Sequence, residues 1–235
     1  MTTEIDWLGA FPLRPATDAV DALCESWKVL AEKYRPHFNP RSAEPALTRV
    51  LKAHVENVTG RERGLLGMWS TEGVINRVEL ETGKLLEERR TDIVYGWNDD
   101  NVGIQFVFEF KKLNRLARSR KQYLGERGLL RFVTGIYGGR QPVAAMVGIL
   151  IDPIERCVPP LRDALSDATL GPPLRLRSGS VGQPYDRPSR LFPGTADFDT
   201  EHDRAPELAD RGAIRVAHVF VGFAYTNPER SGCTR

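Results

Sequence analysis

Hydrophobic positions near the start of the chain recur with the spacing of amphipathic helices. Between residues 18 and 34 the apolar side chains return every three or four positions, and prolines follow at 36 and 40. This pattern predicts a helix over 18–34 that ends before the prolines. A second helix is predicted to begin after Ser42, a suitable N-cap, with Pro45 in its first turn and Gly60 at its end. Its apolar stripe is formed by Leu47, Leu51, Val55 and Val58.

Residues 73–111 have the composition of a meander of antiparallel strands. β-branched and aromatic residues alternate there with groups of turn residues. We expect one strand over 89–97, a turn over 98–101 and a return strand that reaches Lys111. Because side chains alternate along a strand, one face of the return strand carries Ile104, Phe106, Phe108 and Phe110. The other face, which either carries chemistry or meets water, has Gln105, Val107, Glu109 and Lys111.

The chain after Lys111 is predicted to form a helix over 115–133 and then an interior strand over 143–151. The strand is predicted because 143–151 is an almost wholly apolar run. The order helix, helix, strand meander, helix and strand predicts an α/β fold with helices flanking a mixed central sheet. The buried positions of the 115–133 helix are expected to be Leu116, Tyr123, Leu124, Leu130 and Phe132.

The C-terminal third is rich in proline, and its periodicity is weak. Over 152–211 we expect long loops, with one short helix near 154–165 and a strand near 174–177. Two interpretations stay open for these loops: ordinary surface segments, or an arm that embraces a substrate. A further strand is predicted over 212–227, with His218 as a satisfied interior histidine. The length suits a single domain over 1–235 with its core over about 42–151.

The composition is that of a globular protein, with 41% apolar and 27% charged residues. No apolar run approaches the ~20 residues that span a bilayer. The first ten residues carry two acids and no basic cluster, unlike a secretory signal. We therefore expect a cytoplasmic protein that does not bind membranes. Cys24, Cys157 and Cys233 are far apart and lack metal-site spacing, so they are interpreted as reduced thiols.

The distribution of charge is more informative than the net charge of +2. Residues 111–131 contain eight basic residues and one acid, a local balance of +7. Such a concentrated positive field attracts polyanions such as nucleic acids. The alternative is a solvated helix face without a partner. The side chains expected to contact phosphates are Lys112, Arg115, Arg118, Lys121 and Arg127.

Two acids and a lysine on neighbouring strands form the candidate chemical centre. Asp92 lies on the strand that enters the 98–101 turn, and Glu109 and Lys111 lie on the strand that leaves it. A hairpin pivot between residues 99 and 100 places Asp92 opposite Val107, which makes the carboxylates of Asp92 and Glu109 diagonal neighbours. The alternative is an amphipathic strand whose polar face is simply wet.

A carboxylate pair of this kind suits a hard divalent cation. Mg²⁺ or Mn²⁺ takes oxygen ligands, typically one or two carboxylates together with waters and a substrate phosphate. Asp92 and Glu109 could supply carboxylates and Phe110 its backbone carbonyl, and a bound ion polarises phosphate and lowers the pKa of water. Lys111 shares a face with Glu109, where it could hold the attacking water or offset developing negative charge.

The segments Thr91-Asp92-Ile93 and Phe108-Glu109-Phe110-Lys111 together resemble the signature of the PD-(D/E)xK, restriction-endonuclease-like superfamily of nucleases. Thr91 stands where many members have proline. The pattern over 44–151 is similar to the αβββαβ core of that superfamily, with a helix before the meander and a basic helix and a strand after the lysine. Members often carry a further acid on the preceding helix, and Glu44 is the residue that matches. A favourable interaction with the helix dipole is the other explanation for Glu44.

The resemblance implies an endonuclease dependent on Mg²⁺ or Mn²⁺, with Asp92, Glu109 and Lys111 as catalytic residues. It would hydrolyse phosphodiester bonds of DNA in bacterial restriction, anti-phage defence or repair. A homodimer or a partner defence subunit is the expected assembly. Two alternatives stay open: a non-catalytic nucleic-acid-binding or scaffold subunit on the same fold, and an RNase.

Overall fold

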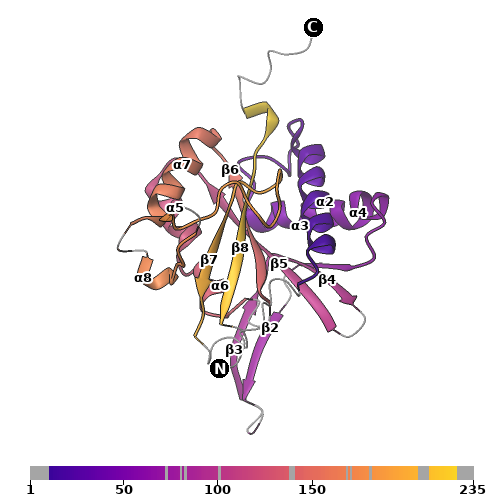
Figure 1. Ribbon diagram of the computed structural model, residues 1–235. Helices are drawn as coiled ribbons and strands as arrows, with labels where there is room; N and C mark the ends of the chain where they lie inside the picture. The colour runs from indigo at the N-terminus through magenta and orange to yellow at the C-terminus, as the bar shows by residue number, and fades with distance from the viewer. Residues whose placement is uncertain are drawn as a thin grey trace.

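The computed structural model has a central β-sheet with helices on both faces (Figure 1). It describes residues 11–71, 74–79, 81, 84–99, 102–137, 141–167, 169, 171–179, 182–205 and 212–226. The class is α/β, as predicted, and the main sheet is open, six-stranded and mixed. Among the helices described, none has both the length and the apolar composition that crossing a membrane requires.

Helices α2 (Leu13–Ala31) and α3 (Glu44–His54) confirm the two predicted N-terminal helices, with different bounds. α2 begins and ends earlier than predicted and buries Leu23 and Trp27. The predicted N-cap of α3 is wrong, because Ala43 holds the cap position and makes no side-chain cap bond. The hydroxyl of Ser42 instead accepts the backbone N–H of Asn39 at 3.3 Å.

The second helical segment does not end at Gly60 as predicted. It continues through the π-helical turn η1 (Val55–Thr59) into α4 (Gly60–Glu62). Position 60, directly after the π-helical turn, favours glycine because a Cβ there would lie 2.6 Å from the carbonyl oxygen of Val55. The chain leaves the helix at Gly64, whose φ of +68° favours glycine.

The main sheet has the strand order β1-β4-β5-β6-β8-β7. The central strands β5, β6 and β8 run parallel, and the outer pairs are antiparallel. β6 is buried along its whole length, which confirms the predicted interior strand. In sheet order, the strands are β1 (Met68–Thr71), β4 (Ile93–Asp99), β5 (Val102–Leu113), β6 (Val143–Leu150), β8 (Ala213–Val221) and β7 (Phe198–Asp203).

The predicted meander is divided between two sheets. β2 (Val74–Glu79) pairs with β3 (Lys84–Arg90) in a two-stranded sheet, and Figure 1 shows this hairpin projecting from the main sheet. The predicted single strand over 89–97 is therefore wrong, because β3 ends at Arg90 and β4 begins at Ile93. Asp92 lies in the link between them, where its carboxylate accepts a backbone N–H of β5.

Two short helices replace the single helix predicted over 115–133. α5 (Ala117–Leu124) and α6 (Leu130–Val133) are separated by a tight turn at Gly128, where a Cβ would lie 2.1 Å from the carbonyl oxygen of Tyr123. The break changes which side chains face inward. Leu116 is 59% exposed, contrary to the prediction, and Leu129 is buried where Leu130 was expected.

The proline-rich segment is more structured than predicted. α7 (Ile154–Leu165) confirms the short helix, whereas α8 (Gly171–Leu174) lies where a strand began in the prediction. After α8, residue 176 makes one isolated bridge to His202. The prediction missed β7 because half of its residues are acidic. Those acids have partners, since Arg177 pairs with Glu201 at 2.9 Å and with Asp203 at 2.6 Å.

Each face of the main sheet has its own hydrophobic core. α2 and α3 cover the face that carries Phe106, Phe108 and Phe110, and Phe192 of the proline-rich segment joins this core. α5, α6 and α7 cover the opposite face, which carries Val107. β5 is therefore buried on both sides, and a polar residue on it, such as Glu109, is held in the interior. The chain ends its described part with η3 (Ala224–Thr226).

His218 confirms the prediction of a satisfied interior histidine. Because the Leu174 carbonyl can only accept, Nδ1 of His202 donates to it at 2.7 Å, and Nε2 of His202 accepts from the Thr200 hydroxyl at 2.7 Å. That hydroxyl accepts from Nε2 of His218 at 2.9 Å, and Nδ1 of His218 accepts from the Tyr123 hydroxyl at 3.0 Å. Burial lowers the pKa of His202 to about 4 and also lowers the pKa of His218, so both rings are neutral.

Cys24 and Cys157 are free thiols, as predicted, and Cys233 lies outside the described residues. Burial raises the pKa of Cys24 to about 12 and that of Cys157 to about 11. Both thiols are therefore protonated at neutral pH and are poor nucleophiles.

Candidate functional site

The candidate site lies where β4 begins and β5 continues past it. Ile93, the first residue of β4, pairs with Phe108, and β5 runs on to Leu113 without a β4 partner. Just before β4, the Oδ2 atom of Asp92 accepts the backbone N–H of Phe110 at 2.8 Å. The carboxylate thus occupies the position that a strand carbonyl would otherwise take.

The hairpin register differs from the predicted one. Asp99 pairs with Val102, so the pivot falls one residue later than expected, between positions 100 and 101, which lie outside the described residues. Continued by one position beyond the pair of Ile93 and Phe108, this register brings Asp92 level with Glu109 instead of Val107. The two acids are therefore closer to direct opposition than the predicted diagonal.

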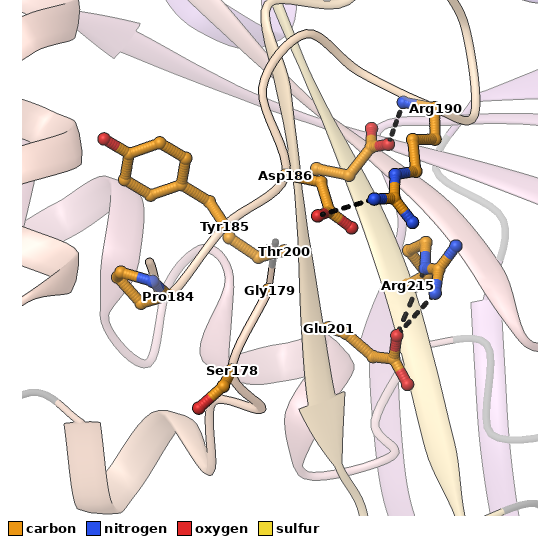
Figure 2. Close-up of a pocket in the computed structure, with 10 residues that line it drawn as sticks. Ser178, Gly179, Pro184, Tyr185, Asp186, Arg190, Thr200, Glu201 and Arg215 are labelled. Carbon is orange, nitrogen blue, oxygen red and sulfur yellow. Dashed lines mark hydrogen bonds and ion pairs between the residues drawn. The ribbon is translucent and has the colours of Figure 1, made fainter. Parts of the chain in front are cut away.

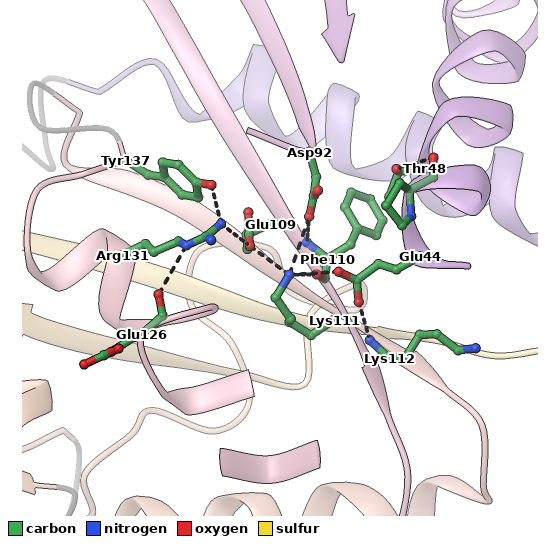
Figure 3. Close-up of polar contacts among 11 residues, drawn as sticks. Glu44, Thr48, Asp92, Glu109, Phe110, Lys111, Lys112, Glu126, Arg131 and Tyr137 are labelled. Atoms are coloured by element: carbon green, nitrogen blue, oxygen red, sulfur yellow. Dashed lines mark hydrogen bonds and ion pairs between the residues drawn. The ribbon is translucent and has the colours of Figure 1, made fainter. Parts of the chain in front are cut away.

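The ammonium of Lys111 lies at the centre of the site (Figure 3). Its Nζ atom is 2.9 Å from Oε1 of Glu109, 2.9 Å from Oε1 of Glu44 and 2.5 Å from the carbonyl oxygen of Phe110. Oδ2 of Asp92 is 3.9 Å away. The three predicted catalytic residues and both additional predicted metal ligands therefore surround one point.

Glu44 joins the site from the first turn of α3. While its Oε1 atom accepts from Lys111, its Oε2 atom accepts the backbone N–H of Lys112 at 2.9 Å. Glu44 therefore connects the start of the helix to the free edge of β5. Its contacts are to these two lysines, so the helix dipole alone does not account for its placement.

Glu109 is fully buried and only partly satisfied. Its Oε1 atom forms an ion pair with Lys111 at 2.9 Å and accepts from the guanidinium of Arg131 at 3.2 Å, whereas its buried Oε2 atom has no hydrogen-bond partner among the described residues. Arg131 also donates to the hydroxyl of Tyr137 and, at 3.2 Å, to the carbonyl of Glu126. Sequence reasoning counted Arg131 only as part of the basic run and missed Tyr137.

The buried charged groups of the site shift one another's pKa values. Burial raises the pKa of Glu109 to about 8, and the Asp92 carboxylate adds to that rise. Burial likewise raises the pKa of Asp92, with the Lys111 ammonium acting in the opposite direction. Burial alone would lower the pKa of Lys111, but the Glu109 and Glu44 carboxylates outweigh it, and the net shift is upward. Burial therefore opposes ionisation of Glu109 and Asp92, and a further cation at the centre would favour their ionised forms.

The donor atoms match the chemistry of a hard divalent ion. Three carboxylates and one backbone carbonyl surround the centre, and in the described part of the chain the buried Oε2 atom of Glu109 has no hydrogen-bond partner. Within the described residues, however, no three His, Cys, Asp or Glu side chains are already gathered closely enough to hold an ion. The carboxylates are arranged around the Lys111 ammonium, so the donor set fits a metal only if that ammonium moves.

The predicted phosphate-contacting residues separate into two groups. The ammonium of Lys112 donates to the carbonyls of Pro40 at 2.6 Å and Ser42 at 3.2 Å, so it is bound to the loop before α3. The other four predicted side chains are exposed around α5 and the turn that follows it: Arg115, Arg118, Lys121 and Arg127.

A polar pocket of about 280 Å³ lies elsewhere, beside β7, three strands away from β5 in the sheet (Figure 2). The proline-rich segment forms one of its walls. Its charged groups are already paired, since Arg215 contacts Glu201 at 2.6 Å and Arg190 contacts Asp186 at 3.7 Å. This pairing gives a structural explanation for the pocket's charges.

Comparison with known protein families, with characterised proteins and with solved structures gave no match.

Proposed function

We propose that this protein is a metal-dependent nuclease that hydrolyses phosphodiester bonds of DNA with Mg²⁺ or Mn²⁺ as cofactor. The observation that carries the proposal is the convergence of the Glu44, Asp92 and Glu109 carboxylates and the Phe110 carbonyl on one point. These are the ligands that hard divalent ions prefer. A bound ion would polarise the scissile phosphate and lower the pKa of a bound water.

We also propose that residues 42–151 form a restriction-endonuclease-like αβββαβ core. The order α3, antiparallel strands, α5 and β6 supports this assignment, as does the parallel pairing of β5 with β6. An acid at the start of one strand, followed by an acid and a lysine on the next, is the arrangement that the resemblance implies.

In this proposal each side chain of the site has a role that follows from its position. Asp92 and Glu44 are fixed by backbone N–H groups of β5 and would hold the ion at the strand edge. Glu109 contributes a buried carboxylate whose orientation is set by Arg131. The Lys111 ammonium would offset negative charge that develops on the phosphate in the transition state.

The exposed basic side chains around α5 would bind the phosphate backbone. Arg118 and Lys121 lie in the helix, and Arg115 and Arg127 flank it. Contacts of this kind depend on charge, so they provide affinity for nucleic acid of any sequence and weaken as salt rises.

Cleavage assays with matched variants test the proposal. Purified wild-type protein would be incubated with plasmid DNA, single-stranded DNA and RNA in Mg²⁺, in Mn²⁺ and in EDTA, beside Asp92→Asn and Lys111→Met. We expect the wild type to cut DNA only with a divalent ion, and each variant to lose at least two orders of magnitude in rate. Glu126→Gln, an exposed acid close to the site in sequence, is the matched control and should cut normally.

The other outcomes identify the alternatives. Equal cutting by wild type and variants would mean a contaminant or a different centre. Cutting of RNA alone would favour an RNase. Binding without cutting by the wild type would favour a non-catalytic nucleic-acid-binding or scaffold subunit.

A role in bacterial restriction or anti-phage defence, in the cytoplasm, extends the same proposal. Nucleases of this type often act as pairs, so we propose a homodimer or a complex with a partner defence subunit. Light scattering with and without DNA would measure the assembly.

A further inference from the structure

The Lys111 side chain is bonded as a buried cation at the centre of an acidic cluster. The ammonium donates to the Phe110 carbonyl at 2.5 Å and to Glu44 at 2.9 Å, and it forms an ion pair with Glu109 at 2.9 Å. The side chain is only 13% exposed. The ammonium is therefore engaged by three oxygens of the protein in this state and is not directed at a substrate.

The same oxygens cannot bind this ammonium and a divalent ion together. Metal–oxygen distances are about 2.0–2.1 Å for Mg²⁺ and 2.3–2.6 Å for Ca²⁺. An ion coordinated by the oxygens of Glu44, Glu109 and Phe110 would therefore lie almost where the Nζ atom of Lys111 now lies. Repulsion between the two cations and lack of space both exclude joint occupancy.

The carboxylates have anchors that do not depend on the lysine. Asp92 is held by the N–H of Phe110 at 2.8 Å, and Glu44 by the N–H of Lys112 at 2.9 Å. Glu109 is held by Arg131 at 3.2 Å. Departure of the Lys111 ammonium would therefore leave the three acids in place and release its flexible side chain, which is the moving part of the site.

We propose that Lys111 is a resident counter-cation that a divalent ion must displace, so that ion entry and release of the lysine are one coupled step. The proposal rests on the proposed nuclease function and deepens it by assigning a regulation to the same site. Before ion entry, Lys111 is bound to the carboxylates. After ion entry, its ammonium is free for the phosphate, which ties the availability of that group to metal loading.

Removing the resident charge should tighten metal binding. Three carboxylates face the cations Lys111 and Arg131, and replacing Lys111 by methionine raises the net negative charge of the cluster by one while it keeps a chain of similar length. We expect Lys111→Met to bind Ca²⁺ and Mn²⁺ at least about tenfold more tightly than the wild type, by calorimetry without nucleic acid. Lys28→Met, at an exposed lysine of α2, loses the same charge, and its affinity for Ca²⁺ and Mn²⁺ should stay within about twofold of the wild-type value.

A second measurement uses the wild type alone and does not depend on the folding of a variant. In nuclear magnetic resonance spectra, the ammonium of Lys111 should show slow hydrogen exchange without metal, because its protons are bonded and buried. Addition of Ca²⁺ should abolish this protection. Protection that persists at saturating Ca²⁺, or affinity in Lys111→Met equal to or below that of the wild type, would overturn the proposal.

The two proposals can fail separately. If Lys111→Met binds ions more tightly and the wild type cuts no nucleic acid, the displacement proposal stands and the nuclease proposal falls. If the wild type cuts DNA with metal and Lys111→Met binds ions no more tightly, the reverse holds. If neither protein binds Ca²⁺ or Mn²⁺, both are overturned.

Discussion

Replacing Glu109 by glutamine tests whether the protein folds around an acid whose burial disfavours its ionised form. The side chain is only 1% exposed, and burial raises its pKa from 4.5 to about 8. The folded protein then holds this proton more tightly than the unfolded chain does, so stability is lost as pH rises between these two values. At ~1.4 kcal/mol per pKa unit, the loss approaches about 5 kcal/mol at the upper end. That is a large fraction of the roughly 5–15 kcal/mol by which domains are stable.

The assay is urea denaturation of wild type and Glu109→Gln in EDTA, from about pH 5 to about pH 8. Because His202 and His218 have lowered pKa values, they add stability as pH rises over part of this range, so the difference between the two proteins is the informative quantity. We expect the free energy of unfolding of Glu109→Gln, minus that of the wild type, to increase steadily as pH rises. For Glu126→Gln, at an exposed position, the difference in the free energy of unfolding from the wild type should not change with pH. A flat or shrinking difference for Glu109→Gln would refute the reasoning.

Three further predictions concern the fold and the basic surface. Tyr123→Phe leaves Nδ1 of His218 buried without its donor and should cost about 1–3 kcal/mol in denaturation experiments, whereas no loss would contradict the hydrogen-bond chain. Gly60→Ala places a Cβ 2.6 Å from a backbone carbonyl in the π-helical turn and should lower the melting temperature by several degrees, and an unchanged melting temperature would contradict this steric argument. Reversing Arg118 and Lys121 to glutamate should weaken DNA binding equally at all sequences and flatten its salt dependence, and an unchanged slope would exclude this surface.

Those parts of the fold that depend on local pattern could be predicted from the sequence. β6 is apolar throughout and α7 is strongly amphipathic, so both lie where they were expected. The structure brings Asp92, Glu109 and Lys111 together although the hairpin register was wrong. A shift of the pivot by one residue changes each pairing by two positions, and this preserves the face to which a side chain points.

Features that depend on tertiary contacts could not be predicted. Arg131 bonds Glu109 from α6, a helix separated from α5 by the turn at Gly128, so this contact could not be predicted from one continuous helix. Glu44 could be suggested as a ligand, but its bond to the N–H of Lys112 depends on how α3 docks against β5. The acidic strand β7 has too little apolar content to be recognised without the arginines that pair with it, such as Arg215.

The carboxylates of Asp92 and Glu44 also protect the molecule from other chains. They accept the N–H groups of Phe110 and Lys112 on the part of β5 that β4 leaves uncovered. An uncovered strand edge is a template for intermolecular pairing and aggregation. Truncating either acid to alanine would therefore reduce solubility as well as remove a proposed ligand, whereas an amide of the same shape keeps an acceptor on the strand.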